Sequence, residues 1–193
     1  SIYPHHTMKE ILDWCMENGT TFWEYVNLHE DNNIWDYLNE VWKCMSAAVE
    51  RGLDNEGVLP GPLKLARKAS SFYTKAKSYQ GSMQRRAMSF SFALAVAEEN
   101  ASGGVIVTAP TCGSCGVLPA VFYLNRKFYD FSDKKIIRAL ATAGIIGNLI
   151  KTNASISGAE VGCQGEIGSA CSMASGAAVQ LFGGTPMQIE YGA

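Results

Sequence analysis

The stretch from Ile136 to Ile150 constrains the fold most, because its apolar residues occupy nearly every side of a helix. Isoleucine, leucine and alanine dominate it, and Ser132 or Asp133 is placed to cap its start. A helix without a polar face needs other elements packed around it. The stretch therefore predicts a globular fold built around one buried central helix.

Helix-start signals recur along the rest of the chain. Thr7 and Glu10 form a capping box, and Thr185 and Gln188 form another with a proline at the first helical position. Gly19 is expected to end the first helix. Further helices are expected from Thr20 or Thr21, from Asn32 or Asn33 to Gly52, and over 83–99, 117–128 and 167–181. We therefore expect an all-α, multi-helix domain.

Composition narrows the class of protein. The 193 residues are 47% hydrophobic and carry a formal net charge of -2, which suits one domain with a sizeable core. The absence of a basic run disfavours a nucleic-acid partner. No apolar window is long enough to span a membrane, and the first residues do not resemble a signal peptide. A cytoplasmic location without a membrane partner is expected.

Two loops rich in glycine and proline interrupt the helices, at 54–62 and 108–116. After the first loop, Lys64, Arg67 and Lys68 are expected on one side of a helix, because they are three and four residues apart. Such a basic face is either solvated or an anion site for a substrate carboxylate. The spacing does not decide between the two.

Six cysteines offer possible ligands or thiols. Cys15 and Cys44 lie in amphipathic helical patterns and are expected to be buried. Cys112-Gly-Ser-Cys115 fits a redox pair, half a zinc site, or two unrelated cysteines. A redox motif needs a βαβ context and a zinc site needs a second Cys or His pair. Neither is evident, so a redox or zinc module using this pair is kept only as the non-enzymatic alternative.

Cys163 lies between glycines just before a helix that is expected to open near Gly165. Glycine lets the backbone approach a bulky inorganic group, and a helix N-terminus favours a thiolate. Glu160 and Glu166 flank it and offer a base, an ammonium ligand or simple helix capping. The polar residues Asn153, Ser155 and Ser157 precede it and either cap the central helix or contact a ligand. Cys171, two turns further on, is expected to pack inside.

The run from Asn153 to Met173, with Gly-Cys-Gln-Gly at its centre, resembles the signature of bacterial iron–sulfur-dependent L-serine dehydratases, in their alpha chain or catalytic domain. The stretches Glu56–Pro62 and Thr108–Ala120 agree with the same family. The resemblance covers nearly the whole chain. It implies a mostly helical catalytic domain with a [4Fe–4S] cluster on three cysteines and one iron open to substrate.

In this family the cysteine of Gly-Cys-Gln-Gly is a cluster ligand, which points to Cys163. The other two ligands belong to Thr-Cys-Asp-Pro and Pro-Cys motifs that should follow the last helix. Residues 1–193 are therefore expected to be an alpha domain truncated before those motifs, with an incomplete cluster and no activity on its own. The family commonly has asparagine at the position of Cys112, so the Cys-x-x-Cys pair looks incidental.

The resemblance implies an L-serine ammonia-lyase, which eliminates water from L-serine and yields pyruvate and ammonia without pyridoxal phosphate. The open iron would act as a Lewis acid on the hydroxyl. Expected substrate contacts are Asn153, Ser155, Ser157, Thr108 and Thr111, with Lys64 or Arg67 for the carboxylate. The general base is not assigned. A cysteine desulfidase of the same superfamily is the enzymatic alternative.

The resemblance also implies partners. The family has a beta region, either fused or on a separate chain, and nothing in this chain resembles it. A homo- or hetero-oligomeric assembly is expected, with L-serine as the small-molecule substrate.

Overall fold

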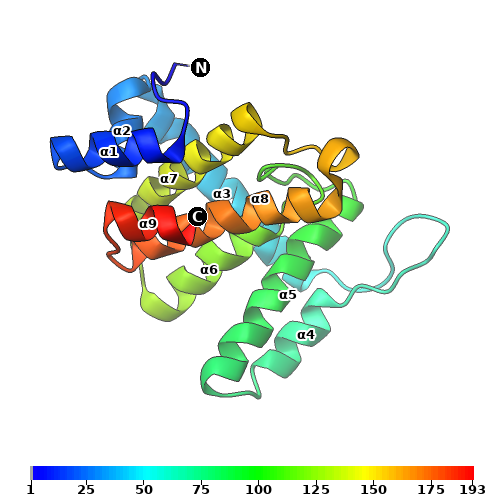
Figure 1. Ribbon diagram of the computed structural model, residues 1–193. Coiled ribbons are helices and arrows are strands. Elements are labelled where there is room, and N and C mark those ends of the chain that lie inside the picture. The colour runs from blue at the N-terminus through cyan, green and yellow to red at the C-terminus, as the bar shows by residue number, and fades with distance from the viewer. Residues whose placement is uncertain (1) are drawn as a thin grey trace. The chain divides into compact units, whose positions relative to one another are not determined.

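A computed structural model describes residues 2–193, and helices make up most of it (Figure 1). Within that range the helices are α1 Met8–Asn18, α2 Phe22–His29, α3 Asn33–Asp54, α4 Ala69–Ala76, α5 Gly81–Ala101, α6 Val117–Tyr129, α7 Asp133–Asn153, α8 Gly158–Leu181 and α9 Pro186–Gly192. The expectation of an all-α fold is confirmed. The helices divide into two compact units, one formed by the chain up to Glu40 with Phe131–Ala193 and the other by Val41–Asp130.

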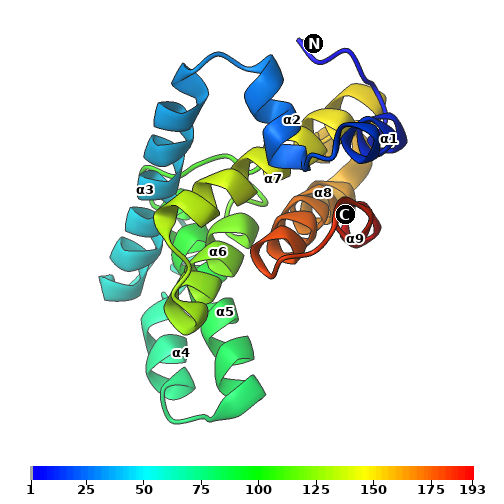
Figure 2. The ribbon, with the colours of Figure 1, turned by 90° about the vertical axis from the view of Figure 1, so that its left-hand side faces the viewer.

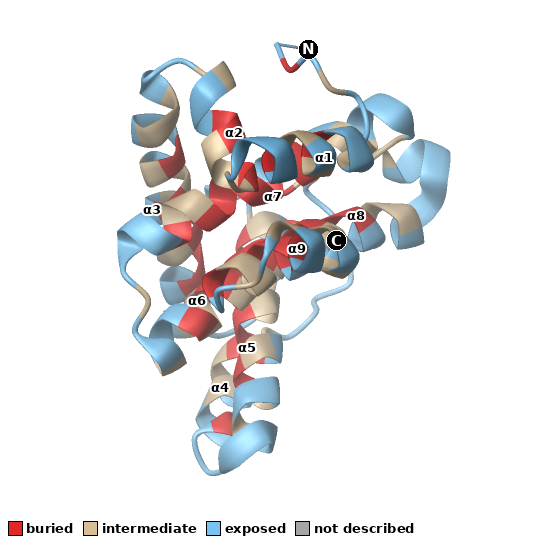
Figure 3. Ribbon diagram, turned by 60° about the vertical axis from the view of Figure 1, so that its left-hand side comes forward, coloured by how far each residue is buried: buried red, intermediate tan, exposed pale blue. Residues whose placement is uncertain are grey.

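The central helix of the first unit is α7, which packs against α2 and α8. Its buried side chains include Ile136, Leu140 and Ile145, and Figure 3 shows buried residues along much of its length. A Cβ on Gly147 would lie 2.9 Å from the Met173 sulfur of α8. Glycine thus lets α7 and α8 approach closely, and the prediction of a buried central helix is confirmed.

Short terminal helices complete this unit. α9 packs against α8 and α1, so the first and last helices lie side by side (Figures 1 and 2). Both predicted capping boxes are present: Thr7 accepts from the Glu10 backbone N–H at 3.2 Å, and Thr185 accepts from that of Gln188 at 3.3 Å. Gly19 adopts φ 62° at the end of α1, a left-handed conformation that glycine allows.

In the second unit α5 packs against α4 and α6. Its core gathers Met88, Phe92 and Val96 of α5 with Val49 of α3. The prediction that Gly52 ends a helix is wrong, because α3 continues to Asp54. A Cβ on Gly52 would lie 2.2 Å from the Ala95 carbonyl oxygen. This glycine is required for close helix packing and not for a turn.

Two other local predictions are also corrected. Residues 61–68 form turns and a bridge between Val58 and Ala66, so no helix carries Lys64, Arg67 and Lys68. The central helix also runs past the apolar stretch that ends at Ile150, because α7 extends to Asn153. Among residues 2–193, none of the helices is long and apolar enough to cross a membrane.

Candidate functional site

The end of α7 is tied to the N-terminal segment through Asn153. Its Nδ2 donates to the His6 carbonyl at 2.6 Å and to the Leu149 carbonyl at 3.0 Å. The first bond links the end of α7 to the N-terminal segment, and the second adds a donor to a carbonyl of the last helical turn. Asn153 therefore positions the start of the polar loop that follows.

Two serines shape that loop. Ser155 Oγ donates to the carboxylate of Glu160 and accepts from the Ser157 backbone N–H at 3.1 Å. Ser157 is the N-cap of α8, and its Oγ accepts from the Ala159 N–H at 3.3 Å. Both hydroxyls thus have intramolecular partners that order the turn leading into α8.

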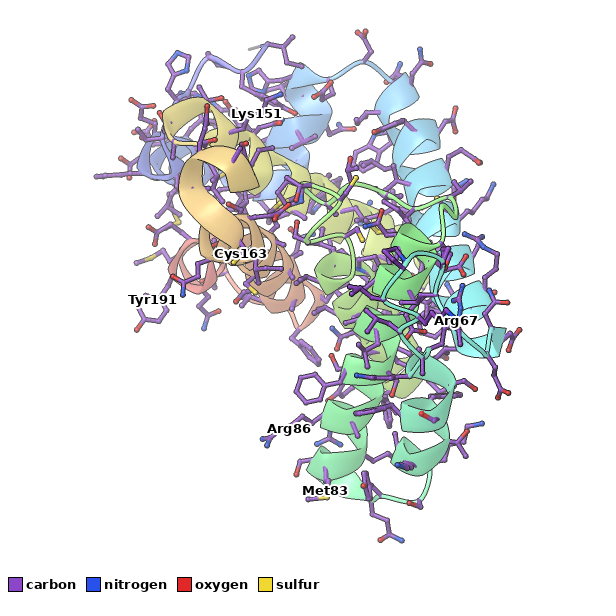
Figure 4. All side chains as sticks on the ribbon, turned by 90° about the vertical axis from the view of Figure 1, so that its right-hand side faces the viewer. Arg67, Met83, Arg86, Lys151, Cys163 and Tyr191 are labelled. Carbon is purple, nitrogen blue, oxygen red and sulfur yellow. The ribbon has the colours of Figure 1, made fainter. Side chains whose placement is uncertain are left out.

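Cys163 follows a break in α8. Gly162 has φ 71° and ψ 174°, which interrupts the helix after a single turn. This conformation favours glycine, because a Cβ is strained at such a φ. The thiol of Cys163 is exposed at the start of the longer helical segment, and Figure 4 shows where Cys163 lies on α8. The prediction that this helix opens near Gly165 is wrong, because α8 begins at Gly158; Cys163 is the first residue of the segment that follows the break.

Two carboxylates lie beside the same turn. Glu160 is held by Ser155, and the Glu166 carboxylate folds back so that a Cβ on Gly158 would lie 3.1 Å from its Oε2. Residues 158–164 are all exposed. The segment therefore presents the Cys163 thiol and the Glu160 carboxylate on an accessible surface, with Glu166 partly buried beside them.

These residues do not form a complete three-thiolate site. Within residues 2–193, no three His, Cys, Asp or Glu side chains gather where a metal ion could be held. Cys171 is exposed and not packed inside as predicted, and eight residues of helix place it about 12 Å further along the axis. Cys163 can serve as one ligand, and the described chain does not supply the others around it.

The Cys112–Cys115 loop belongs to the second unit. Cys115 is buried in the core beside Val49 and Phe92, whereas Cys112 is exposed. One thiol faces the core and the other faces solvent, so the two thiols do not present a shared face to a metal ion. This arrangement disfavours a zinc module at this motif, and the helical surroundings lack the βαβ context that a redox pair needs.

Ser114 organises the loop that carries Thr108 and Thr111. It is buried, and its Oγ accepts from the Thr111 N–H at 3.3 Å and lies 3.1 Å from the Thr111 hydroxyl. It also donates to the Ala109 carbonyl at 3.3 Å. Thr108 is exposed. Sequence reasoning missed Ser114, since a serine inside a loop carries no periodic signal.

Lys64 and Arg67 lie on the loop between α3 and α4 and have different environments. Lys64 is exposed and has φ 48°. The Arg67 side chain is only 10% exposed; its Nη2 donates to Ser102 at 2.5 Å and its Nη1 lies 3.7 Å from Glu99. That Nη1 atom is buried and makes no hydrogen bond to a described residue. Arg67 is therefore engaged with α5.

Two buried acids at the end of α5 anchor this loop. Glu98 accepts from the backbone N–H groups of Lys68 and Ala69 at 2.6 and 3.2 Å, which caps the start of α4. Glu99 binds Arg51 and Asn55 at 3.0 and 2.9 Å. Sequence reasoning missed both. The available signal was acidic residues in a last helical turn, where the helix dipole disfavours them unless cations or donors compensate.

The predicted site residues therefore fall into two groups. Asn153, Ser155, Ser157 and Cys163 lie in one continuous stretch of the first unit. Lys64, Arg67, Thr108 and Thr111 belong to the second unit.

Comparison with known proteins places the chain in one protein family. A family model described as serine dehydratase alpha chain matches residues 6–193. The chain is 45% identical to the L-serine dehydratases of Haemophilus influenzae and of Streptomyces coelicolor, and 44% identical to L-serine dehydratase 1 of Escherichia coli. Each match covers 97% of this chain and 43% of the relative. The chain thus spans less than half the length of these relatives.

Proposed function

Because the chain belongs to the serine dehydratase alpha chain family, we propose that its protein is an L-serine ammonia-lyase. The observation that carries this proposal is the match over residues 6–193. The reaction removes the Cα proton and the β-hydroxyl of L-serine, and the resulting aminoacrylate rearranges and hydrolyses to pyruvate and ammonia. The proposal includes a cytoplasmic location, since an exposed unpaired thiol such as Cys163 persists in a reducing compartment.

We further propose that Cys163 provides one thiolate to a [4Fe–4S] cluster. When bound, such a cluster supplies a Lewis acid for the departing hydroxyl. Support comes from the exposed thiol, from the break at Gly162, which clears side-chain bulk next to it, and from the helix N-terminus. The remaining thiolates are assigned to parts of the protein outside residues 2–193, since those residues hold no three-ligand group.

This chain's own residues would bind and orient the amino acid. Glu160 and Glu166 are suited to hold the substrate ammonium, and Ser155 fixes the Glu160 carboxylate. For the substrate carboxylate, Lys64 is the better candidate, because Arg67 is already engaged with Glu99 and Ser102. Asn153 and Ser157 would act mainly by shaping the loop. Thr108 offers an exposed hydroxyl, and that of Thr111 lies beside Ser114.

The relatives' extra length fits a further region, and we include in the proposal a beta region, fused or separate, within a homo- or hetero-oligomer. Incubating the complete protein with L-serine and with L-cysteine tests the reaction. Pyruvate from L-serine is expected. Sulfide from L-cysteine without pyruvate from L-serine would replace the proposal by a cysteine desulfidase.

A further inference from the structure

A second candidate binding site lies in the first unit, away from the Cys163 segment in sequence. A cleft of about 400 Å³ is lined by Trp23 and Asn27 of α2, Trp35 of α3, and Lys134, Ile137 and Arg138 of α7. Its volume falls within the range of small-ligand pockets, roughly 300–1,000 Å³. None of its lining residues belongs to the loop or helix that carries Cys163.

The walls of this cleft are held in place by specific contacts. The Arg138 guanidinium carbon lies 3.9 Å from the centre of the Trp23 ring. Trp23 meets Trp35 edge-on with 6.1 Å between ring centres. Trp35 Nε1 donates to Asn27 Oδ1 at 2.8 Å. Because these side chains are fixed by one another, the cleft is preformed and loses little entropy on binding.

Charge is distributed unevenly around the cleft. Lys134 and Arg138 both line it, and no acidic side chain does. Arg138 is half-buried, and among residues 2–193 neither cation forms an ion pair with a carboxylate. Arg138 is stacked on the Trp23 ring, and Lys134 is exposed, so both cations are available to an anion in the cleft. An anionic ligand would add a full counter-charge, while the indoles offer flat surfaces and Ile137 an apolar one to its body.

We propose that this cleft binds a small organic anion with a flat aromatic body. Its anionic group, a carboxylate or a phosphate, lies between Lys134 and Arg138, and its ring lies against Trp35 and Ile137. The lining contains no thiol, carboxylate, hydroxyl or imidazole. The site is therefore assigned to binding and not to a reaction.

The test is an NMR titration of the complete protein that follows the indole N–H signals of the four tryptophans in residues 1–193. The probe is naphthoate, with neutral naphthylmethanol, non-aromatic acetate and adenosine monophosphate as separate arms. Naphthoate is expected to shift the Trp23 and Trp35 signals and to bind at least about tenfold more tightly than naphthylmethanol or acetate. Tighter binding of adenosine monophosphate would identify phosphate as the preferred anionic group.

Three variants make the test specific. Arg138→Met and Lys134→Met should each weaken naphthoate binding about tenfold. Lys135→Met is the matched control, because Lys135 stacks on Phe131 and does not line the cleft; it should bind as the parent does. Equal affinity for naphthoate and naphthylmethanol, no shift at either indole, or unchanged binding in the exposed-site variant Lys134→Met would overturn the proposal. The Lys134 variant keeps the test valid if Arg138→Met unfolds.

Discussion

Arg51 and Glu99 form an ion pair in which Nε of Arg51 donates to Oε2 of Glu99 at 3.0 Å. The pair joins α3 to the end of α5, and Arg51 also donates to the Val105 carbonyl at 2.6 Å. Arg67 approaches the same carboxylate from the following loop. One buried acid thus connects three segments of the second unit.

Glu99→Ala should destabilise this unit strongly. It leaves the buried Arg67 without its counter-charge, and breaking a buried pair from one side costs about 3–5 kcal/mol. Urea unfolding of the complete protein measures the change. Glu17→Ala, at an exposed position of α1, is the control and should fall within about 0.5 kcal/mol of the parent. Similar unfolding midpoints for both variants would show that Glu99 does not hold the loop.

Two glycines in helices should respond with opposite sign to alanine. Gly52→Ala places a Cβ 2.2 Å from the Ala95 carbonyl oxygen, and such overpacking costs about 1–3 kcal/mol. Gly144→Ala meets nothing within 4 Å on α7 and should stabilise by about 0.5–1 kcal/mol. Thermal unfolding of the two variants distinguishes these effects. A gain in stability for Gly52→Ala would contradict the close contact of α3 and α5.

The capping box of α1 should make part of the stability depend on pH. Hydrogen bonds from the backbone N–H groups of His6 and Thr7 lower the pKa of Glu10 below its ordinary value of 4.5. A lowered folded-state pKa means that the stabilisation is present above pH 4.5 and is lost as the pH falls through the folded value. Glu10→Gln should therefore show a shallower loss of stability on acidification, with Glu17→Gln behaving as the parent. If the stability of Glu10→Gln and of the parent falls with pH in parallel, the capping box does not contribute this pH dependence.

Cysteine alkylation should follow burial. Burial raises the pKa of Cys15 to about 11, so at pH 8 only about one molecule in a thousand carries its thiolate. Cys171 and Cys112 are exposed and should react with iodoacetamide before Cys15 under native conditions. Mass spectrometry of peptides over time gives the order. Early labelling of Cys15 relative to Cys171 would contradict the fold of the first unit.

Local signals explain what the sequence predicted well. The caps at Thr7 and Thr185 and the apolar stretch of α7 depend on residues within a few positions, so pattern alone identifies them. The place of Cys163 beside a glycine and a helix start is equally local. These features needed no knowledge of tertiary contacts.

Contacts between residues far apart in the sequence explain which predictions from the sequence were wrong. The turns around Lys64 depend on the backbone bridge between Val58 and Ala66. They also depend on Glu98, which caps the start of α4 and lies 30 residues from Lys68 in the sequence. Gly52 looks like a terminator in sequence but is required for contact with Ala95. Cys171 lies in a helix of small apolar residues whose pattern does not mark a buried face. Partners distant in sequence decide each of these cases.

The central claim is that Cys163 is a cofactor ligand in a serine-deaminating enzyme. Measuring iron and acid-labile sulfide per chain in the complete protein, for Cys163→Ser and Cys171→Ser, tests it most directly. Both thiols are exposed on α8, so Cys171→Ser controls for the effect of a cysteine-to-serine change in this helix. We predict that Cys163→Ser loses the iron and the pyruvate formed from L-serine while Cys171→Ser keeps both. Full iron content and activity in Cys163→Ser would contradict the account.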